Sequence, residues 1–295
     1  SAVCDTFGVP LLVDNAHGAY LRFLPGEPLH PIALGAAMCC DSAHKTLPVV
    51  TGGAYLHLGE NAPVQEEAAV RGALALFGST SPSYLILQSL DACNRQLTES
   101  YPAGLQRCCS RLSALRGELN AAAQAAGCPV PLALDGPGRE PLKLTLDAAA
   151  LGMTGTALAD ALRGGQLECE YADPRYVVLM FTPCNPPQDY ARLRTVLRQC
   201  LHGLPAAGAL LQPEELAGEF MALAQQARAH CTIRQAVFAP QERIPVQQAL
   251  GRICAMPTVS CPPAIPIAVS GEEITPAALE WMQRYGVTEV SVLRR

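Results

Sequence analysis

Short apolar runs alternate with longer amphipathic segments over the first hundred residues of the chain. Runs that are wholly or largely apolar cover 9–13, 37–40 and 53–58, and polar residues follow the first two. Such short continuous runs are typical of strands buried on both faces. The segments 64–77 and 82–100 between and after them have the character of helices. This alternation predicts an α/β fold, in which helices cover a sheet.

A second, smaller α/β unit is expected further along the chain. Segment 103–126 is rich in Arg, Ala and Leu and predicts a long helix, and the Gly- and Pro-bearing stretch 127–141 then marks a boundary. The pattern predicts strands at 142–146 and 177–181 and helices at 154–163, 187–202, 213–230 and from Pro276 onward, where Thr275 is the N-cap. We therefore expect three domains, at 1–127, 128–205 and 206–295.

Composition excludes several classes of protein. The 295 residues are 49% hydrophobic and carry a formal net charge of −5. That charge, without a basic run, argues against an electrostatic nucleic-acid binder, and the apolar content is too high for a disordered chain. No apolar run approaches the roughly 18 residues of a membrane span, and the first residues lead us to expect no signal peptide. We expect a soluble, cytoplasmic protein without a membrane partner.

Cysteine is abundant, but its distribution is not that of a metal site or a disulfide scaffold. The 13 cysteines are an odd number, are scattered along the chain, and contain no C-x-x-C spacing. Structural metal sites usually present paired ligands at such spacing, and disulfide scaffolds are shorter. We therefore predict reduced thiols that act as small apolar residues, and no metal site.

Two polar clusters carry the candidate chemistry, DNAHG at 14–18 and SAHKT at 42–46. Lys45 is one of only two lysines in the chain, the other being Lys143. A lysine at a buried strand end is desolvated, which lowers the pKa of its ammonium and makes the amine a nucleophile able to hold pyridoxal 5'-phosphate as a Schiff base. A carboxylate beside the ring nitrogen keeps that cofactor protonated, and Asp14 has the right charge and setting.

Neighbouring residues extend this cofactor hypothesis. Ser42 and His44 flank the lysine and could donate hydrogen bonds to a phosphate. Ala16 is small enough for a ring to lie flat over it, and His17 could reach the substituents of the ring. Any one of these residues alone is more often a cap or a satisfied loop residue. The two clusters together favour the cofactor site.

These residues resemble the bacterial ornithine/lysine/arginine decarboxylases, which have the aspartate-aminotransferase fold (fold type I). The resemblance begins with DNAHG and with SAHKTLP at 42–48. It continues in STSPSY at 79–84 with QSLD at 88–91, in LKLT at 142–145 with GMTG at 152–155, and in CPPAIP at 261–266 with SGE at 270–272. It thus spans nearly the whole chain, and the S-x-H-K element with D-x-A-H upstream is fairly specific.

The resemblance implies a function and a role for the matching positions. The expected reaction is decarboxylation of lysine, ornithine or arginine to a polyamine-type product, with Lys45 bound to pyridoxal phosphate and Asp14 paired with its ring nitrogen. Ala16 would pack on the ring, and Ser42 and His44 would contact the phosphate. Either Lys45 or His17 would return the proton. The active site would lie in a homodimer or higher homo-oligomer, where Ser79 or Thr80 reaches the partner's phosphate.

The chain departs from the family's pattern in two ways. Lys45 comes early, so we expect the large domain to be incomplete at its N-terminus and the chain to be the C-terminal part of a longer polypeptide. Four residues also differ from those that the family usually has. Met256 replaces Glu, Cys261 replaces Tyr, Ala264 replaces Gly, and Met153 replaces an aromatic residue. The lost carboxylate leaves the choice of basic amino acid open.

Two alternatives stand beside the decarboxylase hypothesis. One is another pyridoxal-phosphate lyase or transferase on the same fold, because a fold does not determine the reaction. The other is a catalytically silent remnant that acts only in subunit association.

Overall fold

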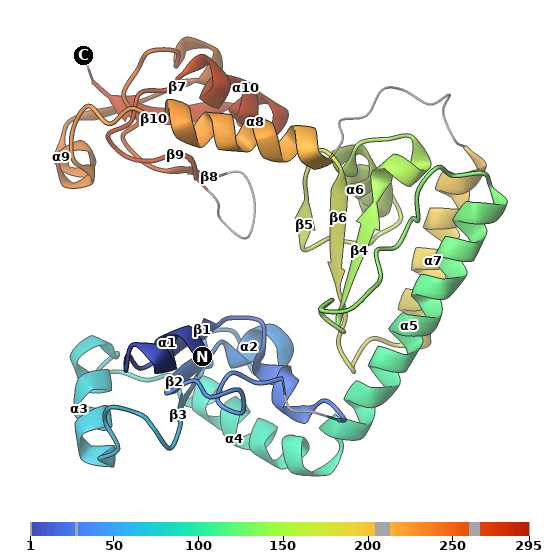
Figure 1. Cartoon of the computed structure of the whole chain (residues 1–295), viewed down its shortest axis with the longest axis vertical. Coiled ribbons are helices and arrows are strands. Elements are labelled where there is room, and N and C mark those ends of the chain that lie inside the picture. The colour runs from blue at the N-terminus through green and yellow to red at the C-terminus, as the bar shows by residue number, and fades with distance from the viewer. Residues whose placement is uncertain (1, 27–28, 204–212, 260–265, 295) are drawn as a thin grey trace. The chain divides into compact units, whose positions relative to one another are not determined.

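The computed structural model describes residues 2–26, 29–203, 213–259 and 266–294. The chain divides into two compact units, one made of 1–111 with 182–185 and the other of 112–181 with 186–295. Figure 1 shows both units as mixtures of helices and short strands. No helix in the described ranges is long and apolar enough to cross a membrane. The three-domain division expected from the sequence stays a prediction.

A three-stranded sheet organises the first unit. Its strands are β1 (Leu12–Asn15), β2 (Met38–Asp41) and β3 (Tyr55–Leu58), in the order β1-β2-β3. β1 and β2 are parallel and β2 and β3 antiparallel. The remaining elements of the unit are helices, namely α1 (Ala2–Thr6), η1 (Ala19–Phe23), α2 (Ala43–Thr46), α3 (Glu67–Phe77) and α4 (Tyr84–Glu99).

Only one face of this sheet is covered by the described residues. Along β2, Cys39 and Asp41 are buried, whereas Cys40 between them is exposed. Leu12 in β1 is 59% exposed. The expectation that the first strand is buried on both faces and begins at residue 9 is therefore wrong. β1 is an edge strand of the described sheet. The apolar run therefore predicted a strand here correctly, but it did not predict how much of that strand is covered.

Side-chain hydrogen bonds attach the covering helices to the sheet. The Tyr55 hydroxyl, on β3, lies 3.1 Å from the carbonyl of Leu90 and 3.0 Å from Asn94 Oδ1, both on α4. The hydroxyl of Tyr101 donates to the carbonyl of Thr46 at 2.9 Å, which fixes the end of α2. These bonds satisfy polar groups that would otherwise be costly to bury.

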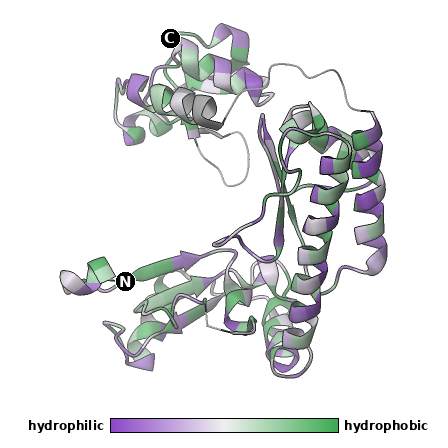
Figure 2. Ribbon diagram, turned by 45° about the vertical axis from the view of Figure 1, so that its right-hand side comes forward, coloured by the Kyte–Doolittle hydropathy of each residue, from purple (hydrophilic) through white to green (hydrophobic). Residues whose placement is uncertain are grey.

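Helix α5 (Tyr101–Ala125) begins in the first unit and continues into the second. Its buried residues recur every three or four positions, as expected for one apolar face of a helix. They are Tyr101, Leu105, Cys108, Leu112, Leu115, Leu119 and Ala123, and the polar residue Arg116 is buried as well. Figure 2 shows hydrophobic and hydrophilic positions mixed along the helices of the molecule.

The second unit contains an antiparallel sheet of order β4-β6-β5, formed by β4 (Lys143–Asp147), β6 (Tyr176–Met180) and β5 (Tyr171–Ala172). Its helices are η2 (Ala148–Leu151), α6 (Gly155–Gly164) and α7 (Pro187–His202). Thr154 caps α6 through the N–H of Ala157, as the sequence predicts. Asp147 and Arg175 form a buried ion pair in which Arg175 Nη2 lies 2.8 Å from Asp147 Oδ2.

The C-terminal residues have a hydrophobic core of their own, formed by residues between Leu223 and Val292. Its elements are α8 (Pro213–Gln226), α9 (Ile233–Phe238), β7 (Gln241–Pro245), η3 (Val246–Gln248), β8 (Thr258–Val259), β9 (Pro266–Ala268), α10 (Pro276–Arg284) and β10 (Glu289–Leu293). β7 pairs with β10 and β8 with β9, both antiparallel. Thr275 and Pro276 begin α10 as predicted.

The cysteines of β2 provide a test of this sheet. No disulfide links the cysteines that the structure describes. Burial and then the neighbouring Asp41 carboxylate raise the pKa of Cys39 to about 12. Partial burial and then Asp14 also raise the pKa of Cys40, but Cys40 is exposed on the other face. Because the thiolate is the reactive form and needs access, we expect iodoacetamide to modify Cys40 at least roughly tenfold faster than Cys39 in the folded protein. Fragment mass spectra resolve the two residues, and equal rates would contradict the described sheet.

Candidate active site

The ends of β1 and β2 bring the two predicted polar clusters together. The strands are parallel neighbours, with Asp14 in register with Cys40 and Asn15 with Asp41. β1 ends at Asn15 and β2 ends at Asp41. Helix α2, which contains Lys45, follows β2 directly. The carboxyl end of parallel strands is the edge where α/β proteins bind ligands.

Successive side chains of the two strands point alternately to the two faces of the sheet. Asp14 and Cys40 share one face and are exposed, while Asn15 and Asp41 share the other. The Lys45 side chain is exposed as well. The described residues therefore do not desolvate Lys45, contrary to the expectation from the sequence, because the strand end that precedes it is covered on one face only.

Ser42 and His44 are placed by α2. Ser42 is the N-cap residue of this short helix, but its side chain makes no capping hydrogen bond. His44 Nδ1 lies 3.0 Å from the carbonyl oxygen of Gly53, and a ring nitrogen that faces a carbonyl carries the proton. This contact occupies Nδ1 of the ring.

The other predicted residues lie in turns. Ala16 and His17 are partly buried and follow β1 directly, in a turn closed by the N–H of Gly18 on the carbonyl of Asn15. Ser79 and Thr80 are exposed, in the segment between α3 and α4. The roles assigned to Ala16, His17, Ser79 and Thr80 stay predictions.

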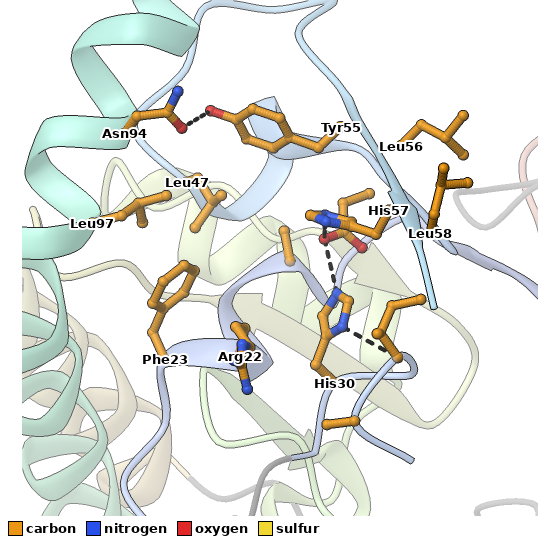
Figure 3. A pocket seen from close by; sticks show the side chains of 14 residues that line it. Arg22, Phe23, His30, Leu47, Tyr55, Leu56, His57, Leu58, Asn94 and Leu97 are labelled. Atoms are coloured by element: carbon orange, nitrogen blue, oxygen red, sulfur yellow. Dashed lines mark hydrogen bonds and ion pairs between the residues drawn. The ribbon is translucent and has the colours of Figure 1, made fainter. Parts of the chain in front are cut away.

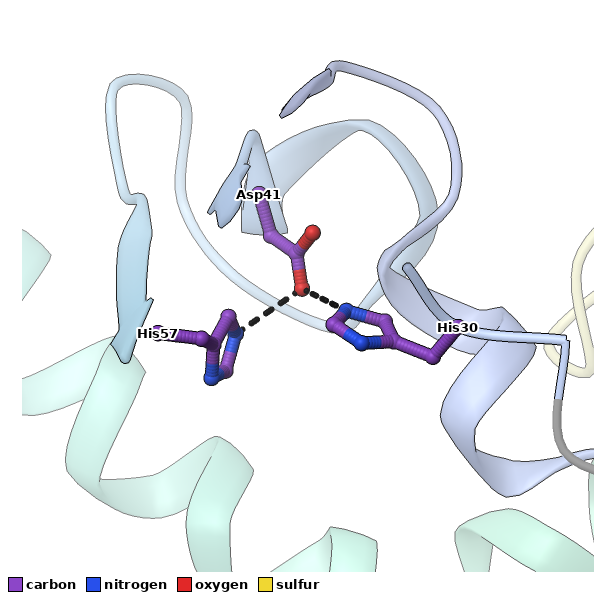
Figure 4. A group of neighbouring side chains, drawn as sticks. All are labelled: His30, Asp41 and His57. Carbon is purple, nitrogen blue, oxygen red and sulfur yellow. Dashed lines mark hydrogen bonds and ion pairs between the residues drawn. The ribbon is translucent and has the colours of Figure 1, made fainter. Parts of the chain in front are cut away.

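A buried cluster on the opposite face of the sheet was not expected from the sequence. Asp41 Oδ2 lies 3.0 Å from His30 Nε2 and 2.9 Å from His57 Nε2 (Figure 4). Asn15 Nδ2 donates to the other oxygen, Oδ1, at 2.7 Å. Burial by itself would raise the pKa of Asp41, but the hydrogen bonds from His30, His57 and Asn15 outweigh it and hold the pKa well below its usual range.

Sequence spacing gave little sign of this cluster. Its members are separated by 11 and 16 residues and come from three segments. The pairing of β2 with β3 brings His57 to Asp41, since His57 lies in register with Cys39, two residues from Asp41, and that pairing is seen only in the structure.

A cavity of about 580 Å³ adjoins the cluster, and His30, Asp41 and His57 line it (Figure 3). The rest of its wall is largely apolar, with Phe23, Leu47 and Leu97 among the lining residues. Arg22 is the only Lys or Arg among the lining residues that the structure describes.

The residues that depart from the expected family pattern are placed only in part. Met256 is 46% exposed and Met153 is partly buried. Cys261 and Ala264 lie outside the described residues. Lys143 lies in β4 and its Nζ is 2.7 Å from Glu140 Oε2.

Comparison with known proteins identifies the fold. The constitutive lysine decarboxylase of E. coli superimposes with a TM-score of 0.66 over 98% of this chain and 55% of that chain, at 18% identity. Lysine decarboxylase A from Pseudomonas aeruginosa gives a TM-score of 0.65 over 93% and 49%, also at 18% identity. At such identities the match shows the fold, and it confirms the expected α/β architecture of fold type I.

Sequence comparison identifies the family. The family model for the Orn/Lys/Arg decarboxylase major domain matches residues 2–137, and that for the C-terminal domain matches 215–288. Arginine decarboxylase of Bacillus subtilis (strain 168) is 30% identical over 282 residues, which are 92% of this chain and 55% of that protein. The chain thus spans about half the length of the curated relatives it matches. It belongs to the Orn/Lys/Arg decarboxylase family.

Proposed function

We propose that the polypeptide carrying these residues decarboxylates a basic amino acid, with pyridoxal 5'-phosphate bound through Lys45. The observation that carries this proposal is the placement of Asp14 and Lys45 at the adjoining carboxyl ends of β1 and β2, in a member of this family. Named relatives support the class of substrate, since they are called arginine and lysine decarboxylases.

The donor set at this edge fits the cofactor. The exposed amine of Lys45 can bond to an aldehyde, and the carboxylate of Asp14, exposed on the open face, can hold a proton on a ring nitrogen. The Ser42 hydroxyl, not used as a cap, can donate a hydrogen bond to a phosphate. His44 can donate one from Nε2 in the doubly protonated form of its ring, because Nδ1 already faces the carbonyl of Gly53. When bound, the cofactor would supply an electron sink for the pair left by the departing carboxyl group.

The last proton transfer falls to this chain's own residues. After carbon dioxide leaves, the substrate carbon needs a proton, and the candidates are Lys45 Nζ and the imidazole of His17. A His17→Gln variant separates them. If His17 donates, carbon dioxide release should fall by about 10² to 10⁴; if Lys45 donates, the rate should change little.

Carbon dioxide release from arginine, lysine and ornithine tests the reaction. The measurement is made with added pyridoxal phosphate on the whole polypeptide that carries these residues. We expect one of the three to be decarboxylated in preference to the others. Conversion of an amino acid without carbon dioxide would instead indicate another lyase or transferase. Failure of all three with cofactor bound would contradict the proposed substrate class.

We also propose that the protein functions as a homo-oligomer in the cytoplasm. Helix α3 has no buried residues, and Leu76 and Phe77 at its end are 79% and 93% exposed. Exposed apolar patches of this kind often mark association surfaces. The patch directly precedes Ser79 and Thr80, which the oligomer hypothesis assigns to the partner's phosphate. The many cysteines without a described disulfide suit a reducing compartment.

A Phe77→Glu variant is expected to weaken the oligomer. The side chain is almost fully exposed, so the substitution leaves the fold intact and places a charge in the association surface. Light scattering after size exclusion should show that the oligomer dissociates into smaller species as the protein is diluted. For the variant, this dissociation should occur at a protein concentration at least tenfold higher than for the parent protein. Phe238→Glu, at a 77% exposed residue of α9, is the matched control and should have no effect. A Phe77→Glu protein that associates like its parent would contradict the proposal.

A further inference from the structure

Three side chains from separate segments meet at one oxygen atom on the covered face of the first sheet. His30 comes from the segment before β2, Asp41 ends β2, and His57 lies in β3. One ligand atom from each lies within 4.8 Å of the others. The His30 and Asp41 side chains are 4% and 3% exposed, whereas His57 is 39% exposed. The cluster is thus buried on one side and accessible on the other.

Neither Lys nor Arg balances the negative charge of Asp41 among the described residues. Among the described residues, the ion-pair partners of Asp41 are His30 and His57, and neither Lys nor Arg is one of them. A carboxylate that is buried without a permanent cation is costly unless another positive charge compensates it. Two imidazoles and one carboxylate are a ligand set that suits a divalent first-row transition metal.

Outer contacts orient the carboxylate for such a ligand. Asn15 Nδ2 and the Cys39 thiol both donate to Asp41 Oδ1, at 2.7 and 3.4 Å. They fix the plane of the carboxylate and leave Oδ2 directed at the two imidazoles. Partners that hold a ligating carboxylate in this way are a regular part of metal sites.

Two of the three separations between the ligand atoms agree with those of a metal site, and the third is at most 4.8 Å. Zinc bonds of about 2.0 to 2.1 Å at angles of 90 to 110° place neighbouring ligand atoms roughly 2.9 to 3.4 Å apart. The two separations measured to Asp41 Oδ2 are 2.9 and 3.0 Å. All three residues line the 580 Å³ cavity, which gives a cation a route in and room for a water ligand.

We propose that His30, Asp41 and His57 bind a divalent transition-metal cation of the zinc class through the two Nε2 atoms and Oδ2. The backbone N–H of Ile32 donates to His30 Nδ1 at 3.3 Å, so Nε2 carries the proton that faces Asp41. On binding, that proton moves to Nδ1 and the long Ile32 contact is given up. The cation would tie the segment before β2 and the neighbouring strand β3 to the strand end that precedes Lys45.

Cobalt and zinc titrations test this site without reference to catalysis. Four-coordinate cobalt with nitrogen and oxygen ligands absorbs in the visible region, and bound thiolate adds a sulfur charge-transfer band in the near ultraviolet. We expect the visible bands without the sulfur band, one equivalent per chain, and their loss when zinc displaces cobalt. The result is independent of the proposed function, because it requires neither pyridoxal phosphate nor substrate.

Two variants assign the ligands. Asp41→Asn and His57→Ala should each weaken zinc binding at least about 100-fold, the upper end of the loss when an outer-shell partner is removed. His57 is partly exposed, so its variant should fold even where the buried Asp41 variant does not. His230→Ala is the matched control, because His230 pairs with Glu273 at 2.9 Å but is not part of a three-ligand cluster among the described residues. Zinc binding unchanged in His57→Ala, or a spectrum dominated by sulfur, would overturn the proposal.

Discussion

A Lys45→Arg variant is expected to release carbon dioxide from its substrate at no more than about one-thousandth of the parent rate, within the range that removal of a catalytic group causes. The substitution keeps the positive charge and much of the length of the side chain. A guanidinium stays protonated, however, and does not form the covalent bond to an aldehyde that a lysine amine forms. The measurement is the initial rate of carbon dioxide release with saturating pyridoxal phosphate.

The second lysine supplies a control with the same chemical change. Lys143 pairs with Glu140 in the second unit, and arginine can keep that ion pair. Lys143→Arg should therefore retain the parent rate within about twofold, since an ion pair of this kind contributes little. An equal loss of the carbon dioxide release rate in both variants would mean that the substitutions act by disturbing the fold. Full activity of Lys45→Arg would exclude Lys45 as the cofactor lysine.

An Asp147→Asn variant is expected to lower the free energy of unfolding by about 3 kcal/mol. Asp147 at the end of β4 receives the guanidinium of Arg175, and their side chains are only 4% and 9% exposed. Asparagine keeps the volume and an oxygen for the N–H of Ala149, which Asp147 caps at 3.0 Å. The variant thus removes mainly the charge and leaves the guanidinium buried without its counterion. Urea unfolding followed by circular dichroism measures the change.

Two further variants interpret that result. Asp160→Asn breaks an exposed ion pair with Arg163 in the same unit and should leave the midpoint of urea unfolding almost unchanged, because exposed ion pairs contribute little to stability. The double variant Asp147→Asn/Arg175→Met should recover most of the lost stability, because it removes the stranded charge. If the two single variants cost the same, burial does not set the strength of the Asp147–Arg175 pair.

Much of this fold could be predicted from the periodicity of apolar residues. The helices α4, α5, α6 and α7 lie close to the predicted ranges, because each has a repeating apolar face and a clear start or end. The strands β7 and β10 were missed, since QERIP and EVSVL are short and each is mostly polar along one face. Short strands take much of their stability from the pairing partner, which a local pattern does not contain.

Part of the candidate site could also be predicted from the sequence, and part could not. Asp14 and Lys45 could be predicted because each sits in a local cluster with its own chemistry, and the strand register brings those clusters to one edge. The cluster of His30, Asp41 and His57 could not, because it depends on the pairing of β2 with β3 and on the path of the chain before β2. The exposure of Lys45 likewise depends on what covers the sheet, and a single strand end does not specify that.

Reduction with borohydride in the presence of pyridoxal phosphate, followed by peptide mass spectrometry, tests the central claim most directly. With only two lysines in the chain, the pattern of labelling has a simple interpretation. The account predicts a phosphopyridoxyl group on Lys45, little on Lys143, and a marked loss of labelling when Asp14 is replaced by Asn. Labelling of Lys143 equal to that of Lys45, or no label on Lys45 in the whole polypeptide, would contradict it.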